Sequence, residues 1–194
     1  MTLADAQIDR YARQIILPEV GGRGQARLLD ARVVIVGEGL PAETAATLLG
    51  RAGIGALALV DGPATLPDLS PDCRVTRHDR HETIERDVTV DLRGTAATSG
   101  PVVIGALAES TVDVATLAGR PCAACLVDRP AFAPASGDAP AALALGALVA
   151  SEVIRVLIEA PRRGRRTTIA LDTGTFRTTT LDPTGGCAVC GAGA

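Results

Sequence analysis

The amino-acid sequence predicts an α/β fold built on a mostly parallel sheet. A β-branched run at residues 33–36 leads into a glycine-rich turn and an apolar helical stretch, and a second apolar strand then ends at Asp61. Firm strand patterns follow at 87–92 and 101–107, and a long apolar helix is predicted over 140–160. Strands alternating with helices in this way are typical of a sheet that is covered by helices.

Composition narrows the class of protein. A chain of 194 residues, 47% hydrophobic and 21% charged, is long enough to bury a core and has the balance of a globular domain. The net charge of -3 argues against nucleic acid or an anionic membrane as the main partner. The N-terminus lacks a basic segment followed by an apolar one, as a signal peptide would have, so we expect a cytoplasmic protein. All basic residues are arginine; the sequence contains no lysine.

The predicted C-terminal helix approaches the length of a membrane span. Glu152 and Arg155 lie inside it, however, and each charge would cost a few kcal/mol within a bilayer. A buried amphipathic helix is therefore the better prediction.

The remaining elements follow from periodicity and from glycine and proline breaks. Two short helices are expected at 3–15 and 22–30, a loop at 62–73 and a short strand at 74–77. The C-terminal half is expected to hold an irregular segment at 117–139, an arginine-rich loop (Arg162, Arg163, Arg165, Arg166), and strands at 167–172 and 175–181 joined as a hairpin through Thr173 and Gly174.

We expect one domain over 1–194. It divides into an N-terminal helical arm (1–31), a trimmed Rossmann core (32–116), and a zinc-binding and hairpin region (117–194).

The glycine-rich turn is the candidate nucleotide site. Gly37 and Gly39 allow a tight turn and close approach to a phosphate, and Ala42 supplies a third small residue for helix packing. The helix N-terminus offers free N–H groups to an anion. Asp61 comes roughly 20 residues later, as expected of a carboxylate that binds ribose.

The cysteines indicate a metal site, and this indication is stronger than the one the glycine-rich turn gives for a nucleotide site. Cys122 and Cys125 form one CxxC pair, and Cys187 and Cys190 form another. Two such pairs match a structural zinc site of four thiolates, which leaves no position open for catalysis. A redox CxxC, or cysteines that only pack, are the alternatives. The fifth cysteine, Cys73, is most simply a packing residue, although nearby arginines would favour a reactive thiolate.

These residues together resemble the ThiF/MoeB/HesA family, the bacterial members of the ubiquitin-activating enzyme superfamily. The resemblance rests on RYARQIILPEVGGRGQARLLDARVVIVGEG, on AGIGALALVDG, on both cysteine knuckles and on GALVASEVIRVLIEA. It implies a Rossmann-like nucleotide-binding fold and a dimer. It also implies ATP- and magnesium-dependent adenylylation of the C-terminal Gly-Gly of a ubiquitin-like sulfur carrier.

The sequence departs from the family pattern where phosphates are handled. The family's phosphate-binding lysine has no counterpart, and Arg74 is the one candidate for its phosphate-binding arginine. Asp91 matches the first acid of the magnesium-binding D-x-x-D motif, but Gly94 replaces the second. The helix and strand that the family has between these motifs, and the crossover after them, are also expected to be cut out. Since each lost charge contact typically costs two to three orders of magnitude in rate, the chain's own ATP site is predicted to be degenerate.

Arg13 is the catalytic residue that the resemblance retains. In the family, the second arginine of RY-x-RQ reaches the ATP of the partner subunit, so Arg13 is predicted to act in trans; a structural salt bridge is the alternative. The leading hypothesis is therefore a degenerate scaffold or dimer-partner subunit. A minimal active adenylyltransferase with a rearranged ATP site, and a nucleotide-binding oxidoreductase or sensor, remain open.

Overall fold

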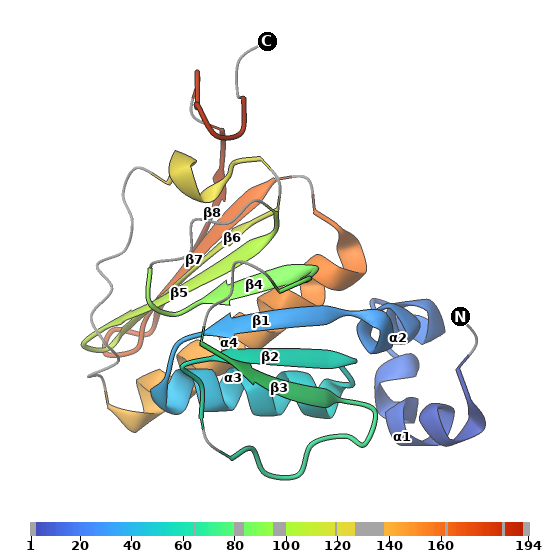
Figure 1. Cartoon of the computed structure of the whole chain (residues 1–194). Helices are drawn as coiled ribbons and strands as arrows, with labels where there is room; N and C mark the ends of the chain where they lie inside the picture. Colours follow the sequence, from blue (N-terminus) through green and yellow to red (C-terminus); the bar gives the residue numbers. More distant parts are fainter. Residues whose placement is uncertain are drawn as a thin grey trace.

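The computed structural model describes residues 3–63, 65–79, 84–94, 100–118, 120–126, 138–161, 163–183 and 185–191 (Figure 1). The elements in chain order are α1 (Asp5–Ile15), α2 (Gly21–Asp30), β1 (Arg32–Val36), α3 (Gly39–Ala52), β2 (Ala56–Val60), β3 (Arg74–His78), β4 (Val88–Asp91), β5 (Val102–Ala108), β6 (Thr111–Leu117), the 3-10 turn η1 (Ala123–Cys125), α4 (Ala139–Glu159), β7 (Gly164–Ala170) and β8 (Thr175–Leu181).

The strands form one eight-stranded sheet in the order β3-β2-β1-β4-β5-β6-β7-β8. Neighbouring strands from β3 to β5 are parallel, and β6, β7 and β8 extend the sheet as antiparallel strands. The chain moves outward from β1 through β2 to β3 and then returns to place β4 on the other side of β1. This Rossmann-like arrangement confirms the predicted α/β fold.

Helices α3 and α4 pack against each other on one face of the sheet (Figure 1). Between them and the sheet lies the main core, made of small and branched apolar side chains from both helices and from β1, β2 and β4. On the other face, a second cluster joins β5 and β6 to Ala123 and Leu126 of the η1 segment. The cysteine-bearing segment is thus packed onto the sheet.

Helix α4 is long and apolar enough to cross a membrane by length and composition, and half of its most apolar window is buried inside the protein. It lies against α3, β5 and β6, and its central Glu152 is 2% exposed. The structure therefore agrees with the prediction of a core helix.

Helix α1 is anchored through the loop that precedes β3. The Tyr11 ring is buried, and its hydroxyl lies 2.5 Å from Ser70 Oγ and donates to Asp72 at 3.0 Å. Asp72 also accepts hydrogen bonds from Gln7 at 3.2 Å and from Arg10 at 2.6 Å. Burial opposes ionisation of Asp72, but these donors outweigh it and lower the pKa of the carboxyl. The RY of the RY-x-RQ block therefore has a structural role.

The structure differs from the sequence-based expectation at two places in the C-terminal half. Strand β6 was not predicted, although Val112 and Val114 are buried and alternate along it. Arg165 and Arg166, expected in a solvated loop, lie in β7, where they pair with Glu152 and Asp113. The arginine-rich segment was predicted as a loop because the acids that neutralise it are more than ten residues away in the sequence.

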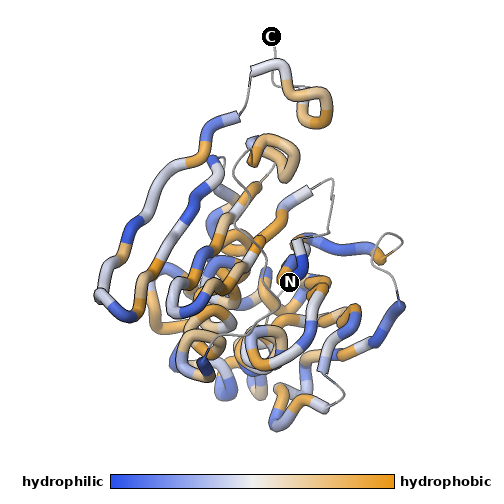
Figure 2. Tube along the Cα trace, turned by 90° about the vertical axis from the view of Figure 1, so that its left-hand side faces the viewer, coloured by the Kyte–Doolittle hydropathy of each residue, from blue (hydrophilic) through white to orange (hydrophobic). Residues whose placement is uncertain are grey.

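Strand β8, at the edge of the sheet beyond β7, is exposed along most of its length. Figure 2 shows it mostly white and blue, leading to the C-terminal segment. Its residues are exposed along Thr175–Thr180, and Phe176 is the large apolar side chain among them. Repeated threonines suit an edge strand, because they favour extended backbone without adding much apolar surface.

Candidate functional site

The candidate nucleotide site lies at the carboxyl ends of β1 and β4, and we refer to this position between the two strand ends as the crevice. In open parallel sheets, ligands bind at the point where the strand order reverses, because the loops diverge there. Here β1 and β4 are the neighbours at that point. The glycine-rich turn follows β1, and α3 begins at Gly39 with Glu38 as its N-cap.

Gly37 has a backbone φ of +140°, a conformation that side chains rarely adopt. A Cβ built on it would lie 2.8 Å from Leu92 Cβ. This glycine therefore allows the loop after β4 to lie close against the turn. Pro41 in the first turn of α3 has no N–H, and Glu38 adds a negative charge, so this helix end is a weaker anion site than the motif predicted.

One arginine from the loop after β4 crosses the crevice. Arg93 Nη1 donates to Asp61 Oδ2 at 2.7 Å, and Arg93 Nη2 donates to Glu38 Oε1 at 3.2 Å. Asp61 follows β2, so the guanidinium links the ends of three parallel strands. The predicted ribose-binding carboxylate is thus brought to the crevice, where it is already paired with an arginine.

The D-x-x-D region is a turn. Asp91 ends β4 with its side chain fully buried, and its Oδ1 accepts from the backbone N–H of Arg93 at 2.9 Å and of Gly94 at 2.8 Å. Gly94 has a φ of +71°. The surviving acid therefore fixes the loop, and the glycine that replaces the second acid adopts a left-handed backbone conformation in it.

Arg74 cannot replace the family's phosphate-binding arginine. It begins β3 and pairs in parallel register with Ala56 at the start of β2, whereas the crevice lies beyond Val60 at the end of β2. Four residues of strand separate the two ends, or about 13 Å. The sequence alone could not exclude Arg74, because it does not show in which direction β3 runs.

Arg13 lies on the exposed side of α1, in the helix whose Arg10 is paired with Asp72. Among the described residues, no hydrogen bond or ion pair involves its guanidinium. The structural salt bridge of this helix is therefore formed by Arg10. Within the part of the chain that is described, Arg13 forms none.

Cys122, Cys125, Cys187 and Cys190 come together, with all four Sγ atoms within 4.8 Å of one another. Neighbouring sulfurs are 3.9, 3.7 and 3.5 Å apart. Tetrahedral zinc with Zn–S bonds of ~2.3 Å requires sulfurs about 3.8 Å apart, so this donor set fits the ion. The cluster predicted from the two CxxC pairs is confirmed as a set of residues that could hold a metal.

The thiol of Cys73 is not activated as a nucleophile. It packs against the main core, and burial raises the pKa of its thiol to about 11. A thiol with that pKa is protonated at neutral pH and is a poor nucleophile. The packing interpretation of Cys73 is therefore favoured.

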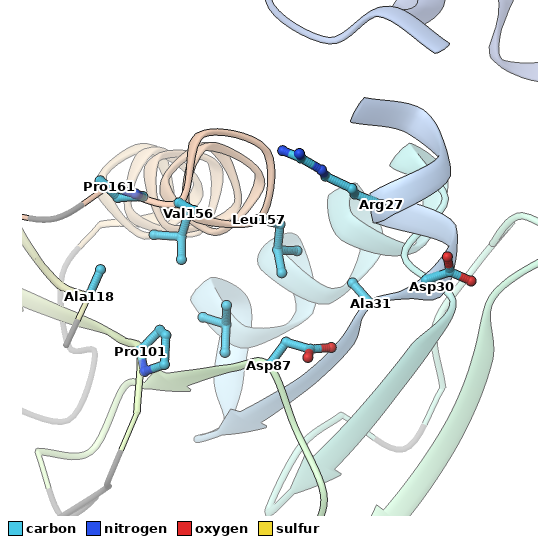
Figure 3. A pocket seen from close by; sticks show the side chains of 11 residues that line it. Arg27, Asp30, Ala31, Asp87, Pro101, Ala118, Val156, Leu157 and Pro161 are labelled. Carbon is cyan, nitrogen blue, oxygen red and sulfur yellow. The ribbon is translucent and has the colours of Figure 1, made fainter. Parts of the chain in front are cut away.

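A separate cavity of about 530 Å³ lies at the opposite end of the sheet, beside the starts of β4 and β5 (Figure 3). Val156, Leu157 and Pro161 give it an apolar wall, and the carboxylates of Asp30 and Asp87 stand on one side. Arg27 donates to the carbonyl of Ile158 at 2.5 Å. With its acids and apolar wall, this cavity does not suit a phosphate ligand, and the crevice at the carboxyl ends remains the candidate site.

Sequence reasoning missed Arg93 and Glu38. The signal for Glu38 was present, since it stands between the two glycines of the turn. Arg93 could have been found by noting that β4 and β1 are neighbours in Rossmann-like sheets, which brings the loop after β4 onto the glycine-rich turn.

The strand order and the turn after β1 define a Rossmann-like α/β fold. Structures of E. coli MccB with MccA-N7isoASN and of PaaA have the same fold. MccB gives a TM-score of 0.73 at 17% identity, over 94% of this chain and 75% of MccB. PaaA gives 0.68 at 15% identity, over 95% of this chain and 76% of PaaA.

Residues 11–64 match the ThiF family, so the resemblance predicted from the sequence is confirmed. The SAMP-activating enzyme E1 of Haloferax volcanii is 48% identical over 61 residues, which are 31% of this chain and 23% of that protein. The adenylyltransferase and sulfurtransferase uba4 of Pyricularia oryzae is 50% identical over 60 residues, 31% of this chain and 12% of its own length. The matches thus span less than a quarter of either relative.

Proposed function

We propose that this chain is a degenerate, zinc-stabilised ThiF-like subunit in the activation of a ubiquitin-like sulfur carrier. It forms a homo- or heterodimer with a ThiF/MoeB-like paralogue in the cytoplasm, and it supplies Arg13 to the partner's ATP site. The observation that carries the proposal is the contrast between two arginines of one helix: Arg10 is paired with Asp72, and Arg13 is exposed without a partner among the described residues.

The chain's own crevice is poorly suited to adenylyl transfer. Adenylyl transfer depends on positive groups and a metal that stabilise the charge on phosphates. The sequence has no lysine, Gly94 stands where a second acid would hold magnesium, and Asp91 is turned onto the backbone of its own loop. Removing one such contact costs about two to three orders of magnitude in rate, so losing several leaves little catalysis.

An arginine in trans can act on a partner's substrate. Its planar guanidinium grips phosphate oxygens, and arginines supplied by a neighbouring subunit contribute about 10³ or more in phosphoryl-transfer systems. Burial of Tyr11 and the ion pair of Arg10 fix α1 on the body of the protein. Arg13 is therefore presented from a firmly held helix.

Zinc is proposed as a structural ion. Four thiolates would complete its tetrahedral coordination and join the segment after β6 to the segment after β8. ATP and magnesium are proposed for the partner's site.

One observation favours the alternative of a minimal active adenylyltransferase. Arg93 places a cation over the crevice, where a rearranged phosphate site would need one. Exchange of pyrophosphate into ATP by the isolated chain, in the presence of a carrier or a C-terminal Gly-Gly peptide, would support that alternative and exclude a degenerate site.

The partner role is tested by affinity purification from the source cell, followed by exchange assays on the recovered complex. A paralogue that retains the lysine and the second acid should be recovered. Arg13→Ala should then lower exchange by the complex at least 100-fold without weakening assembly. Arg23→Ala, at an exposed arginine of α2 without a recorded partner in the described residues, is the matched control and should leave exchange unchanged.

A further inference from the structure

The cavity beside the starts of β4 and β5 (Figure 3) is bordered by the ends of two helices. Asp30 is the last residue of α2, and Ala160 caps the end of α4 with a left-handed φ of +47°. The last carbonyl groups of a helix lack partners within it, and a helix C-terminus carries roughly half a negative charge. Two negative helix ends therefore meet at this cavity.

Two carboxylates add to the negative charge. Within the described part of the chain, the Asp30 side chain forms no hydrogen bond or ion pair, and that of Asp87 accepts the backbone N–H of Arg32 at 2.8 Å. The guanidinium of Arg27 points toward α4, where it donates to the carbonyl of Ile158 at 2.5 Å (Figure 3). The cation that lines the cavity thus leaves both carboxylates without a charged partner among the described residues.

The rest of the wall is apolar. Val156 and Leu157 come from α4, Pro161 follows that helix, and Pro101 precedes β5. The volume of about 530 Å³ lies within the ~300–1,000 Å³ typical of small-molecule sites, which combine apolar walls with a few convergent polar groups. An inorganic cation would gain nothing from the apolar wall, and a neutral apolar molecule would gain nothing from the acids. The occupant that suits both is an apolar body with a cationic end.

We propose that this cavity binds a small organic cation, in which an apolar body carries one ammonium or amidinium group. The body packs against Val156, Leu157 and Pro161, and the cationic group donates hydrogen bonds to the carboxylates of Asp30 and Asp87. The cavity lies at the opposite end of the sheet from the crevice, so this ligand does not compete with a nucleotide. The inference does not rest on the role proposed for Arg13.

The test compares three probes that share a phenyl body and differ in the charge of the polar end: phenethylammonium, 2-phenylethanol and 3-phenylpropionate. Each is titrated into the isolated full chain, and amide shifts are followed by NMR. Phenethylammonium should bind about fivefold or more tightly than the alcohol, because two carboxylates face one cation. 3-Phenylpropionate should bind more weakly than the alcohol. The shifted amides should centre on Ala31, Val88 and Leu157.

Variants separate the charge from the apolar wall. Asp30→Asn and Asp87→Asn each remove one charge, and the asparagine amide keeps an oxygen for the N–H of Arg32. The double variant should bring the ratio of phenethylammonium to alcohol affinity to about one, and Asp30→Asn alone should lower it at least twofold. Asp172→Asn, the same change at the exposed turn between β7 and β8, is the matched control and should keep the ratio. Ala118→Leu fills part of the cavity and should weaken both ligands alike.

Three results would overturn the inference. Phenethylammonium might shift no amide around the cavity at millimolar concentration, it might bind no better than the alcohol, or the wild-type ratio might persist in both Asp30→Asn and the double variant. Unchanged binding of both ligands to Ala118→Leu would place the apolar body elsewhere and count equally against it. The spectra themselves show whether each variant is folded. None of these outcomes bears on pyrophosphate exchange by a complex that uses Arg13.

Discussion

Thr116 of β6 donates a hydrogen bond of 2.6 Å to Glu152 of α4 inside the protein. Arg155 and Arg165 also donate to this carboxylate, which is 2% exposed as a residue. Burial opposes its ionisation, but the donors, Arg165 first, outweigh burial and lower the pKa of Glu152. A charged network thus joins the covering helix to the antiparallel part of the sheet.

This network predicts a pH-dependent stability. Because the pKa of Glu152 is lower in the folded chain than in the unfolded one, its contribution is present above the unfolded value of about 4.3 and is lost as pH falls through the lower, folded pKa. Glu152→Gln should cost about 2 kcal/mol at pH 7. The difference in free energy of unfolding between the two proteins, measured in denaturant from pH 7 downward, should shrink below about pH 4. A constant difference would contradict the assignment.

Replacing Asp72 should loosen the N-terminal arm. Asp72→Asn keeps the size of the side chain but loses the charge that pairs with Arg10, and its amide has one oxygen to accept with where the carboxylate has two. We expect a loss of about 1–2 kcal/mol and faster hydrogen exchange of the α1 amides. Asp9→Asn changes an exposed acid of the same helix and serves as the control. Equal exchange in both variants would show that Asp72 does not anchor the arm.

The proposed zinc site predicts a metal content of about one ion per chain. Cys187→Ser should abolish it and make the segment after β8 sensitive to protease, because the tail would lose its attachment to the η1 segment. Cys73→Ser should retain the ion, since Cys73 lies apart from the cluster. Elemental analysis of the purified proteins is the measurement. Full zinc in Cys187→Ser would exclude the four-thiolate site.

Replacing Gly37 should lower stability through a steric contact whose effect can be separated from that of backbone strain. Gly37→Ala would bring Cβ within 2.8 Å of Leu92 Cβ at a φ of +140°. Gly100→Ala has a comparable φ of +111°, and no atom of the described residues beyond its chain neighbours lies within 4 Å of its Cβ. Strain alone costs about 1–3 kcal/mol, and the contact should raise the loss in Gly37→Ala by a further ~1–3 kcal/mol. Thermal unfolding of the two variants tests this, and equal losses would exclude the steric contribution.

The sequence was sufficient for the elements whose signals are local. The β-branched run before Gly37, the spacing to Asp61 and the two CxxC pairs each lie within a few residues or a known interval, and the fold and the cysteine cluster are as predicted. Contacts between distant segments leave no local signal in the sequence. The pair of Arg93 with Asp61 joins residues 32 positions apart, and the pair of Arg166 with Asp113 joins residues 53 apart.

Strand β6 shows why a local signal can still be missed. Val112 and Val114 alternate with polar residues, but Asp113 lies at the centre of the strand, and an aspartate argues against a buried strand. In the structure its charge is matched by Arg166, with contacts of 3.0 and 2.5 Å. Asp113 is tolerated in β6 because Arg166 of the neighbouring strand β7 neutralises its charge.

With zinc bound, the cysteine cluster would turn the last third of the chain into a closed ring. Cys122 and Cys187 are 65 residues apart, and the chain between them contains α4, β7 and β8. If the two termini were pulled apart, tension would pass through the metal and bypass this ring. The chain would then extend about 200 Å less than its length allows, at ~3.4 Å for each of roughly 60 shielded residues, until the zinc–sulfur bonds broke. Helix α4 and strands β7 and β8 lie inside the ring and would bear the load only after those bonds broke.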